Sequence, residues 1–388
     1  MQYYPDSSNP ATRPELEHSV ERALSPVADS VMLGIFQPNQ AYGEWPTTAP
    51  NPSEWTYQYN LETVLAAEEV GMSFAFPAAR WAGLAGDEIV WRGASLETIT
   101  LTAALLAATS KITLLTTVNT NLHNPVVAAK FGAGLDHIGG GRWGLNVVSG
   151  WGAHEFAAMG VELLDHKERY RYTREWLEVV KMIWRDGEAT LDGDYFKINK
   201  AAGRPRPMQV SPLIVNAGQS YTGMKFSAEC ADYIFCYGES AEKFRQVRAD
   251  VGSQTGIIAT KAVILGATTA EAEDRAQQII DGADRGALRN MMVASGAATV
   301  EVATERLDAP DGVRKYLLGD AIIASAADAG TQLADWAALN DVDGICLNLY
   351  DYLGDLKLIG SDTIPAFEAA LDKHGKTFRR PGAVEPVS

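Results

Sequence analysis

The stretch ITLLTTVNTNLHNPVVAAKFGAGLDHIGGGRWGLNVVSGW, residues 112–151, decides the fold class of this protein. It begins with a run rich in β-branched residues (112–118), continues with a helical segment that starts at a proline (125–138), and returns to a second apolar run (143–148). A proline suits the first turn of a helix, and glycines suit the turn after its end. Two apolar strands joined by one helix form a β-α-β unit, whose strands lie parallel in one sheet.

The same alternation extends along most of the chain. Apolar runs of strand length are followed by helical sequence at eight places. These strand candidates lie at 31–36, 73–77, 112–118, 143–148, 213–216, 232–236, 261–265 and 344–349. Parallel strands that are covered on both faces are near-continuously apolar, as these runs are. Eight such units predict an α/β protein with a (β/α)8 TIM-barrel fold with insertions, rather than an open doubly wound sheet.

Regions outside this alternation indicate the domain organisation. Residues 1–30 are polar and rich in proline and serine, which predicts an N-terminal arm, and residues 31–388 then form a single TIM-barrel domain. Residues 284–320 interrupt the alternation and predict an insertion. The proline-rich loop 40–55 carries two tryptophans and is a candidate wall or lid, and LDGDYFKI (191–198) predicts a hairpin.

Composition and charge exclude several classes of protein. The 388 residues include 49 Asp and Glu against 33 Lys and Arg, a formal net charge of −16 at pH 7. Nucleic-acid binding requires clustered Lys and Arg, so we expect no nucleic-acid partner. Three cysteines without a C-x-x-C pair exclude a disulfide framework and a zinc ribbon. The sequence shows no bilayer-length apolar run and no signal-peptide pattern, so we expect a cytoplasmic protein without a membrane partner.

Polar residues and glycines gather after three of the predicted strands. Residues 119–125 (NTNLHNP) follow the third strand, Asn146 and residues 149–151 (SGW) mark the end of the fourth, and residues 217–220 (AGQS) follow the fifth. The carboxyl ends of barrel strands share one face, where TIM-barrel enzymes place their active sites. This pattern predicts a small-molecule pocket rather than the flat face of a binding module.

Two glycine motifs have competing interpretations. Gly139, Gly141 and Gly144 satisfy G-x-G-x-x-G, but the motif ends a helix and leads into a strand, the reverse of a dinucleotide-binding turn. Residues 218–222 (GQSYT) approach the nucleophile elbow of serine hydrolases, with threonine in place of its last glycine. We favour an anion site formed by backbone N–H groups at a helix N-terminus, and a simple N-cap by Ser220 explains the motif about as well.

Two histidines and an arginine-tyrosine pair are further candidates. No second histidine completes an H-E-x-x-H motif after His154, so we expect no metal site. His123 fits a structural role, as a hydrogen-bonded residue of a loop, as well as it fits a catalytic role. Arg169 and Tyr170 begin a long amphipathic stretch (169–185). The pair forms either a solvated first turn or a phosphate clamp, since arginine offers bidentate donors.

Several separated motifs resemble the bacterial luciferase-like flavin monooxygenases. They are residues 144–151 (GLNVVSGW) followed by Glu155, residues 168–170 (ERY), residues 192–196 (DGDYF) and residues 216–220 (NAGQS). Their order and spacing match the family from about Val31 to Gly238, and more loosely to the C-terminus. Within this family the chain is most similar to the pyrimidine monooxygenases, with dimethylsulfone and alkanesulfonate monooxygenases as near relatives.

The resemblance implies a TIM barrel that uses reduced FMN, supplied by a separate flavin reductase, together with O2. It assigns cofactor binding to Ala79, Arg80, Asn146, Glu155, Arg169, Tyr170, Gly218 and Ser220. Arg169, Tyr170 and the turn at Ser220 would hold the FMN phosphate. Asn146 and Thr120 would line the isoalloxazine and the oxygen side as hydrogen-bond donors. With His123, a candidate partner of substrate or peroxide, they form the expected catalytic set.

The implied activity is the oxygenation or cleavage of a small organic substrate such as a pyrimidine-like heterocycle, through a flavin peroxide or a flavin-N5-oxide. Pro77 and the loop 81–93 depart from the pyrimidine pattern. A sulfone, sulfonate or chlorinated-aromatic substrate, or riboflavin in a flavin-degrading lyase, therefore stays open. Alternative classes are a deazaflavin (coenzyme F420)-dependent dehydrogenase and a flavin-binding protein without turnover. We also expect the chain to form a homo-oligomer.

Overall fold

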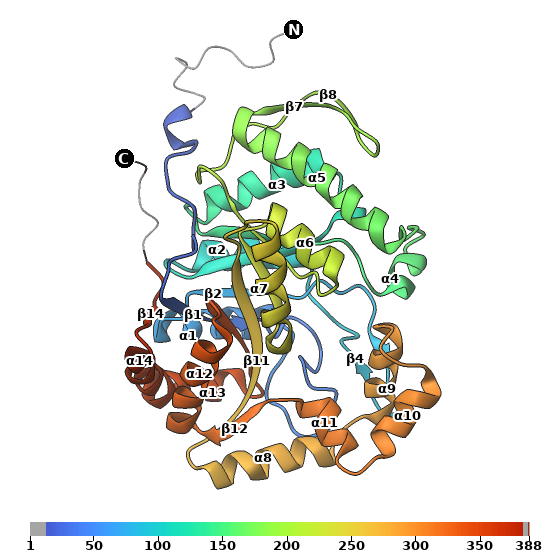
Figure 1. The fold of residues 1–388 in the computed structure, drawn as a ribbon, viewed down its shortest axis with the longest axis vertical. Helices are drawn as coiled ribbons and strands as arrows, with labels where there is room; N and C mark the ends of the chain where they lie inside the picture. The colour runs from blue at the N-terminus through green and yellow to red at the C-terminus, as the bar shows by residue number, and fades with distance from the viewer. Residues whose placement is uncertain (1–12, 383–386, 388) are drawn as a thin grey trace.

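A closed barrel of eight parallel strands forms the centre of the computed structural model, which describes residues 13–382 and 387 (Figure 1). Around the barrel, and in chain order, these are β1 (Ser30–Phe36), β2 (Phe74–Phe76), β5 (Thr113–Asn119), β6 (Trp143–Val148), β9 (Leu213–Asn216), β10 (Tyr233–Tyr237), β11 (Gly256–Gly266) and β13 (Gly344–Asn348). Pairing of β13 with β1 closes the ring. Every strand candidate of the sequence lies on one of them, so the predicted TIM barrel is confirmed.

Six further strands of the described residues lie outside the ring. β12 (Ile322–Ser325) extends the sheet beside β11, and β14 (Thr377–Arg379) pairs with β1. The strands β7 (Glu188–Asp192) and β8 (Lys197–Ala202) form the hairpin predicted at 191–198. A smaller hairpin joins β3 (Leu84–Ala85) to β4 (Val90–Trp91). β12, β14 and the smaller hairpin were not predicted.

Both faces of the barrel wall are buried. Met32 and Cys346 point into the barrel, where they join one apolar cluster. Their neighbours Leu33 and Ile345 point outward and pack under the helices. Successive strand residues face opposite sides of a sheet, so a wall that is covered on both sides requires apolar residues at every position. This requirement explains the near-continuous apolar runs.

Eight helices cover the outside of this wall. They are α1 (Tyr57–Val70), α2 (Thr98–Ala108), α3 (Pro125–Ile138), α5 (His166–Asp186), α6 (Tyr221–Cys230), α7 (Ala241–Asp250), α12 (Ala326–Asn340) and α14 (Ile364–Lys373). Local signals set their ends: Asn124 accepts from Val126 N (2.9 Å) before α3, and Gly187 ends α5 with φ 77°. Among the residues that the structure describes, no helix is both long and apolar enough to cross a membrane.

Four helices lie between β11 and β12. They are α8 (Thr269–Asp281), α9 (Arg285–Ala294), α10 (Val300–Asp308) and α11 (Gly312–Leu318), and Figure 1 shows α9, α10 and α11 gathered at one side of the barrel. Residues 284–320, expected as an insertion, form the last three of them. Their apolar faces share a cluster with Trp45 of the loop 40–55. Trp45 also donates Nε1–H to the carbonyl of Leu349 (2.9 Å), which fastens that loop to the end of β13.

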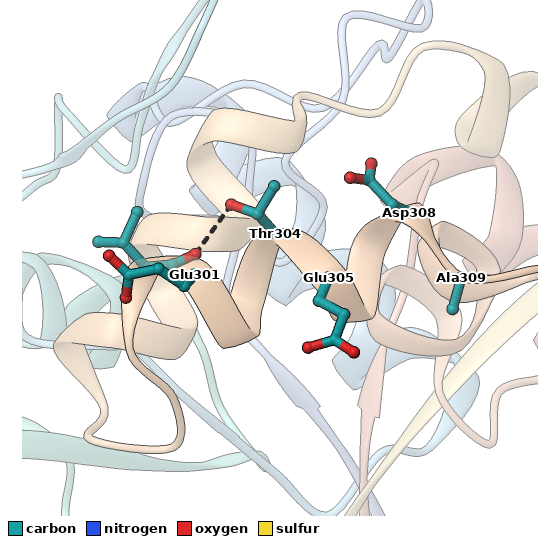
Figure 2. Close-up of a pocket in the computed structure, with 6 residues that line it drawn as sticks. Glu301, Thr304, Glu305, Asp308 and Ala309 are labelled. Atoms are coloured by element: carbon teal, nitrogen blue, oxygen red, sulfur yellow. Dashed lines mark hydrogen bonds between the residues drawn. The ribbon is translucent and has the colours of Figure 1, made fainter.

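The outer face of α10 carries a shallow hollow lined by acidic side chains. Figure 2 shows Glu301, Glu305 and Asp308 along one side of this helix. Thr304 bonds the carbonyl of Val300 in the same helix (2.8 Å) and so adds no outward-directed group. The hollow belongs to the surface of one helix and receives none of the residues that the sequence analysis selected.

Asp284 fastens the loop after β3 to the first turn of α9. Its buried carboxylate accepts hydrogen bonds from the backbone N–H groups of Asp87, Glu88 and Ile89 (2.8–3.0 Å), and it caps α9 through Ala287 N (2.8 Å). Burial by itself would raise the pKa of Asp284, but these four donors lower it below the ordinary value. One side chain therefore holds two segments that lie about 200 residues apart.

Replacing Asp284 by Ala should lower the free energy of unfolding by about 2–4 kcal/mol, because a helix cap and three charged hydrogen bonds are lost. Hydrogen exchange should show faster exchange at Asp87, Glu88 and Ile89. Since the folded-state pKa is depressed, the stabilisation is complete above the unfolded-state value of about 3.9 and is lost as the pH falls through the folded-state pKa. Asp281→Ala, at an exposed position on α8, is the control, and equal losses in both variants would contradict this role.

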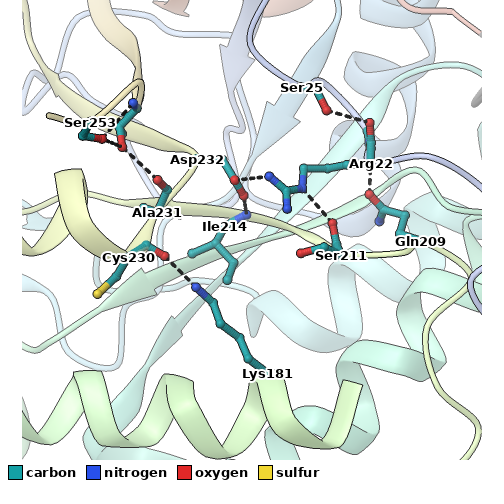
Figure 3. Close-up of polar contacts among 12 residues, drawn as sticks. Arg22, Ser25, Lys181, Gln209, Ser211, Ile214, Cys230, Ala231, Asp232 and Ser253 are labelled. Carbon is teal, nitrogen blue, oxygen red and sulfur yellow. Dashed lines mark hydrogen bonds and ion pairs between the residues drawn. The ribbon is translucent and has the colours of Figure 1, made fainter. Parts of the chain in front are cut away.

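The described part of the N-terminal arm contacts segments that precede barrel strands, and Figure 3 shows Arg22 of this arm beside Asp232 and Ser211. Arg22 forms an ion pair with Asp232, which precedes β10, and donates Nε–H to the carbonyl of Ser211 (2.8 Å). Asp232 also accepts from the backbone N–H of Ile214 in β9 (2.8 Å). Arg22 thus lies at the face opposite to the strand ends that carry the expected site, and Leu24 joins the apolar cluster inside the barrel. The remainder of the expected arm, residues 1–12, lies outside the described residues.

Candidate active site

Asn146 lies on β6 inside the barrel mouth, and its amide orientation follows from its neighbour. Thr117 of β5 is hydrogen-bonded to the carbonyl of Pro77 (2.6 Å), so its hydroxyl proton is committed. The Thr117 oxygen must then accept from Asn146 Nδ2 (3.1 Å). Asn146 Oδ1 is buried without a hydrogen-bond partner. Asn146 can therefore offer an acceptor and one further N–H to a ligand.

Thr120 is fully buried directly after β5 and connects that strand with α5. Its hydroxyl lies 3.0 Å from the hydroxyl of Thr173, which in turn donates to Ser149 Oγ at 3.0 Å. Ser149 follows β6, so this chain of three hydroxyls joins two strand ends and one helix. The expected role of Thr120 on the oxygen side stays a prediction, because its described contacts are within the protein.

His123 lies beside the segment that follows β2. Its Nδ1 lies 3.1 Å from the carbonyl of Asn119, and its own carbonyl accepts from Trp176 Nε1 (2.7 Å). The ring shares a small pocket with Ala79 and Arg80. His123 is thus held by local contacts and still borders the mouth. His154 is exposed on α4 (Ala153–Ala158).

Arg80 and Glu155 form a buried pair that joins the β2 loop to α4. Arg80 Nη1 lies 3.4 Å from Glu155 Oε1, and its guanidinium stacks 3.9 Å above the ring of Trp151. Glu155 also accepts from the backbone N–H of Ala82 (3.3 Å). Burial lowers the pKa of Arg80 to about 10, with the positive charge of Arg92 acting in the same direction and Glu155 opposing it. Arg80 therefore remains charged at neutral pH, and its Nη2 has no partner.

Arg169 and Tyr170 lie in the first turns of α5, next to the loop that follows β6. Arg169 Nη1 donates to the carbonyl of Gly150, while its Nε is buried without a partner. Tyr170 is hydrogen-bonded to Ser220, and burial raises the pKa of its hydroxyl above the ordinary value. Arg169 thus places a cation at the loop after β6, near the Tyr170 hydroxyl, and Tyr170 places a neutral hydroxyl at the turn of Ser220.

Ser220 caps α6, and glycines make room around it. Its hydroxyl accepts from the backbone N–H of Gly223 (3.1 Å), which confirms the N-cap interpretation. A Cβ at Gly218 would lie 2.9 Å from the hydroxyl of Tyr170, and a Cβ at Gly223 would lie 2.4 Å from it. Both glycines are therefore required for the close approach of α5 to the turn.

Gly223→Ala should displace the Tyr170 hydroxyl and lower the free energy of unfolding by about 1–3 kcal/mol, the usual cost of overpacking. Flavin affinity should fall as well, because the turn and the tyrosine separate. Thermal unfolding and a flavin titration measure the two effects. Gly134→Ala is the matched control: it is also a helical glycine, but open space surrounds its Cβ position, so stability should stay equal or rise. The same loss in both variants would exclude a specific contact.

Buried polar atoms without a hydrogen-bond partner mark the barrel mouth. Several of them belong to residues at or beyond the carboxyl ends of the strands: Gln37, Arg80, Asn146, Arg169 and Asn348. Unpaired buried polar groups are rare and costly, so their concentration indicates a bound ligand. The described residues include no group of three or more side chains that could hold a metal ion. The donors of Arg80 and Arg169 and the amide of Asn146 suit a polar, aromatic cofactor that carries a phosphate.

Sequence reasoning missed Gln37, Gly223 and Asn348. Gln37 follows β1 directly, and Asn348 is the last residue of β13. Asn348 could have been found, because it ends its strand's apolar run with an amide, as Asn146 interrupts the run of β6. Gly223 carries no signal of this kind, since only the neighbouring tyrosine of α5 makes it necessary.

The fold and the mouth define an α/β-barrel enzyme with a cofactor pocket at the carboxyl ends of its strands. The family model for luciferase-like monooxygenases matches residues 32–338. The chain belongs to the luciferase-like monooxygenase family, and its class is flavin-dependent monooxygenase.

Curated relatives agree over most of the chain. The pyrimidine monooxygenase RutA of Klebsiella pneumoniae is 30% identical over 349 residues, which cover 86% of this chain and 95% of the relative. The RutA of Enterobacter cloacae is 29% identical over 354 residues, with 87% and 96% covered. The family resemblance inferred from the sequence motifs is therefore confirmed.

Solved structures share the fold at lower identity. A riboflavin lyase determined with modified FMN and riboflavin superposes with a TM-score of 0.77 at 20% identity, covering 92% of this chain and 94% of that one. A coenzyme F420-dependent tetrahydromethanopterin reductase from Methanopyrus kandleri gives a TM-score of 0.63 at 16% identity, covering 87% and 99%. At such identities these likenesses concern the fold alone.

Proposed function

We propose that this protein binds reduced FMN at the barrel mouth and uses O2 to oxygenate or cleave a small organic substrate. The observation that carries the proposal is the set of buried, unpartnered polar atoms of Arg80, Asn146 and Arg169 around one mouth. When bound, reduced FMN supplies the two electrons that let one oxygen atom enter the substrate while the other leaves as water. The protein supplies binding, orientation and exclusion of water.

Each group of residues has a distinct task in this proposal. Arg169, Tyr170 and the turn at Ser220 bind the phosphate. Arg169 supplies a positive charge, Tyr170 a neutral hydroxyl, and the turn at Ser220 the N-terminus of α6. Asn146 and Thr120 line the flavin and oxygen side, and the carboxamide of Asn146 is held in place by Thr117. Ala79, Glu155 and Gly218 shape the walls, and Arg80 adds a positive charge near the mouth. His123 is the candidate partner of the substrate.

The proposed partners follow from the class of enzyme. A separate flavin reductase delivers reduced FMN, the substrate is a small molecule such as a pyrimidine-like heterocycle, and the protein acts in the cytoplasm as a homo-oligomer. Sulfones, sulfonates, chlorinated aromatics and riboflavin are the alternative substrates. The relatives named as pyrimidine monooxygenases support the heterocycle, since they match most of the chain.

The deciding experiment combines the protein with a flavin reductase, NADH, FMN and 18O2, and follows a substrate panel by mass spectrometry. We expect one 18O atom in the product and no turnover without FMN. A parallel reaction with reduced coenzyme F420 tests the dehydrogenase alternative. Hydride transfer from F420 without oxygen uptake would overturn the monooxygenase, and flavin binding without any product would leave only a flavin-binding protein.

A further inference from the structure

The side-chain amide oxygen of Asn348 is buried and accepts no hydrogen bond from any described residue. Asn348 is the last residue of β13, and its Nδ2 donates to Thr260 Oγ1 of the neighbouring strand β11 (3.0 Å). Its Oδ1 is buried and has no hydrogen-bond partner. Cys346, two residues earlier, faces the barrel interior, so strand alternation turns Asn348 to the same side. The free oxygen therefore belongs to the interior of the mouth.

The wall that carries Asn348 lies opposite the one that carries Asn146. Around the ring, β5 and β6 are the third and fourth strands, and β11 and β13 are the seventh and eighth. Each wall holds an asparagine whose Nδ2 donates to a threonine of the adjacent strand. The residues proposed to hold the flavin come from segments near β2, β5, β6 and β9. No residue of β11 or β13 is among them, so Asn348 remains available to a second ligand.

Aromatic rings line the space next to Asn348. The register of β1 and β13 pairs Ile35 with Leu347, which sets Phe36 beside Asn348. Phe36 packs against Phe76 (ring centroids 4.9 Å apart) and Phe235 (6.0 Å), and both Phe36 and Phe235 are partly exposed. Flat aromatic side chains favour contact with a planar ring. The neighbourhood thus combines an apolar aromatic surface with one fixed acceptor.

We propose that Asn348 is a specificity-determining residue whose Oδ1 accepts a hydrogen bond from the substrate. Its ligand is a planar heterocycle with a ring N–H, such as a lactam or imide. Sulfones and sulfonates offer oxygen acceptors only and would leave Oδ1 unpaired, which disfavours them. This inference rests on the proposed function, since it assumes that FMN occupies the opposite wall.

The test compares two ligands that differ in their N–H groups. Uracil and 1,3-dimethyluracil are titrated into the FMN-loaded full-length protein by calorimetry. We expect uracil to bind at least about tenfold more tightly. In Asn348→Leu the affinity for uracil should fall by about tenfold or more, while the affinities for 1,3-dimethyluracil and FMN stay within about threefold. Thr260→Val removes the acceptor that holds the Asn348 amide but keeps Asn348 itself. It should reduce the preference for uracil over 1,3-dimethyluracil several-fold, and it replaces Asn348→Leu as the test if that variant does not fold.

The outcomes separate the inference from the proposed function. If neither variant changes the preference for uracil, or if 1,3-dimethyluracil or dimethylsulfone binds as tightly as uracil to the wild type, Asn348 does not select an N–H donor. If FMN binds but no uracil does, the inference also fails while the flavin proposal stands. Failure of FMN itself to bind would instead reject the proposed function.

Discussion

Arg169→Met is expected to weaken FMN binding by about 10- to 100-fold and to leave riboflavin binding within about threefold. Arg169 is held at the carbonyl of Gly150, its Nε is unpartnered, and its positive charge acts on the Tyr170 hydroxyl beside Ser220. Hydrogen bonds to charged groups contribute about 1.5–3 kcal/mol. Riboflavin lacks the phosphate, so its affinity should not depend on Arg169. Quenching of flavin fluorescence measures both affinities. In a chain with a net charge of −16, few other cations can compensate.

Arg171→Met is the matched control for this prediction. Arg171 lies two residues further along α5, but it is exposed and pairs with Glu168 (2.8 Å) and Asp194 (3.0 Å). Arg171→Met removes the same charge as Arg169→Met, but the Arg171 side chain pairs with Glu168 and Asp194 instead of lying at the proposed phosphate site. FMN affinity should therefore fall less than about twofold. Equal weakening by both variants would indicate a long-range charge effect. Equal loss of riboflavin and FMN in Arg169→Met would indicate damage to the pocket instead of a phosphate contact.

Asn146→Leu should lower the rate of substrate oxygenation by about 100- to 1,000-fold, whereas FMN affinity should fall only about fivefold, the loss expected from one neutral hydrogen bond. Removing one preorganised polar group from an active site has an effect of this size. Leucine keeps the branched shape of asparagine but removes both the free Oδ1 and the N–H. Product formation and the release of hydrogen peroxide are measured together, and the peroxide share should rise.

Thr117→Val gives a graded version of the same test. Thr117 accepts from the carboxamide of Asn146 (3.1 Å) and donates to the carbonyl of Pro77 (2.6 Å). Without this anchor the amide can rotate, so the oxygenation rate should fall by about tenfold, less than in Asn146→Leu. A rate in Asn146→Leu close to that of the wild type would remove Asn146 from the catalytic set. A parallel loss of FMN affinity would make it a binding residue only.

The barrel was predictable because its signal is local and repeated. Each strand needs apolar residues on both faces, so runs such as 112–118 and 143–148 are visible without any knowledge of their partners. Helix ends were equally readable where a cap residue was present, as at Asn124 and Gly187. The short strands β12 and β14 escaped, because their pairing with β11 and β1 depends on chain segments far away in sequence.

Only part of the candidate site could be predicted. Residues in local motifs were found, whereas contacts between segments far apart in sequence were not. Asn146 and Arg169 stand in motifs next to strand ends or at a helix start, so the residue types and their positions suggested chemistry. Which groups they meet depends on contacts between distant segments: Arg80 meets Glu155 across 75 residues, and Thr120 meets Thr173 across 53. These contacts form only when the barrel closes.

The sequence by itself determined the parallel barrel and the edge at which its polar residues collect, because periodicity and cap residues act over a few positions. The likeness to flavin enzymes came separately, from the resemblance of several short motifs to a known family. Tertiary structure alone decided which polar atoms remain unpaired. Asn348 and Asn146 end up on opposite walls because β13 and β6 stand four places apart in a ring of eight. Hydrogen bonding is a property of neighbours in space, so the free oxygens that indicate cofactor and substrate become visible only in the closed barrel.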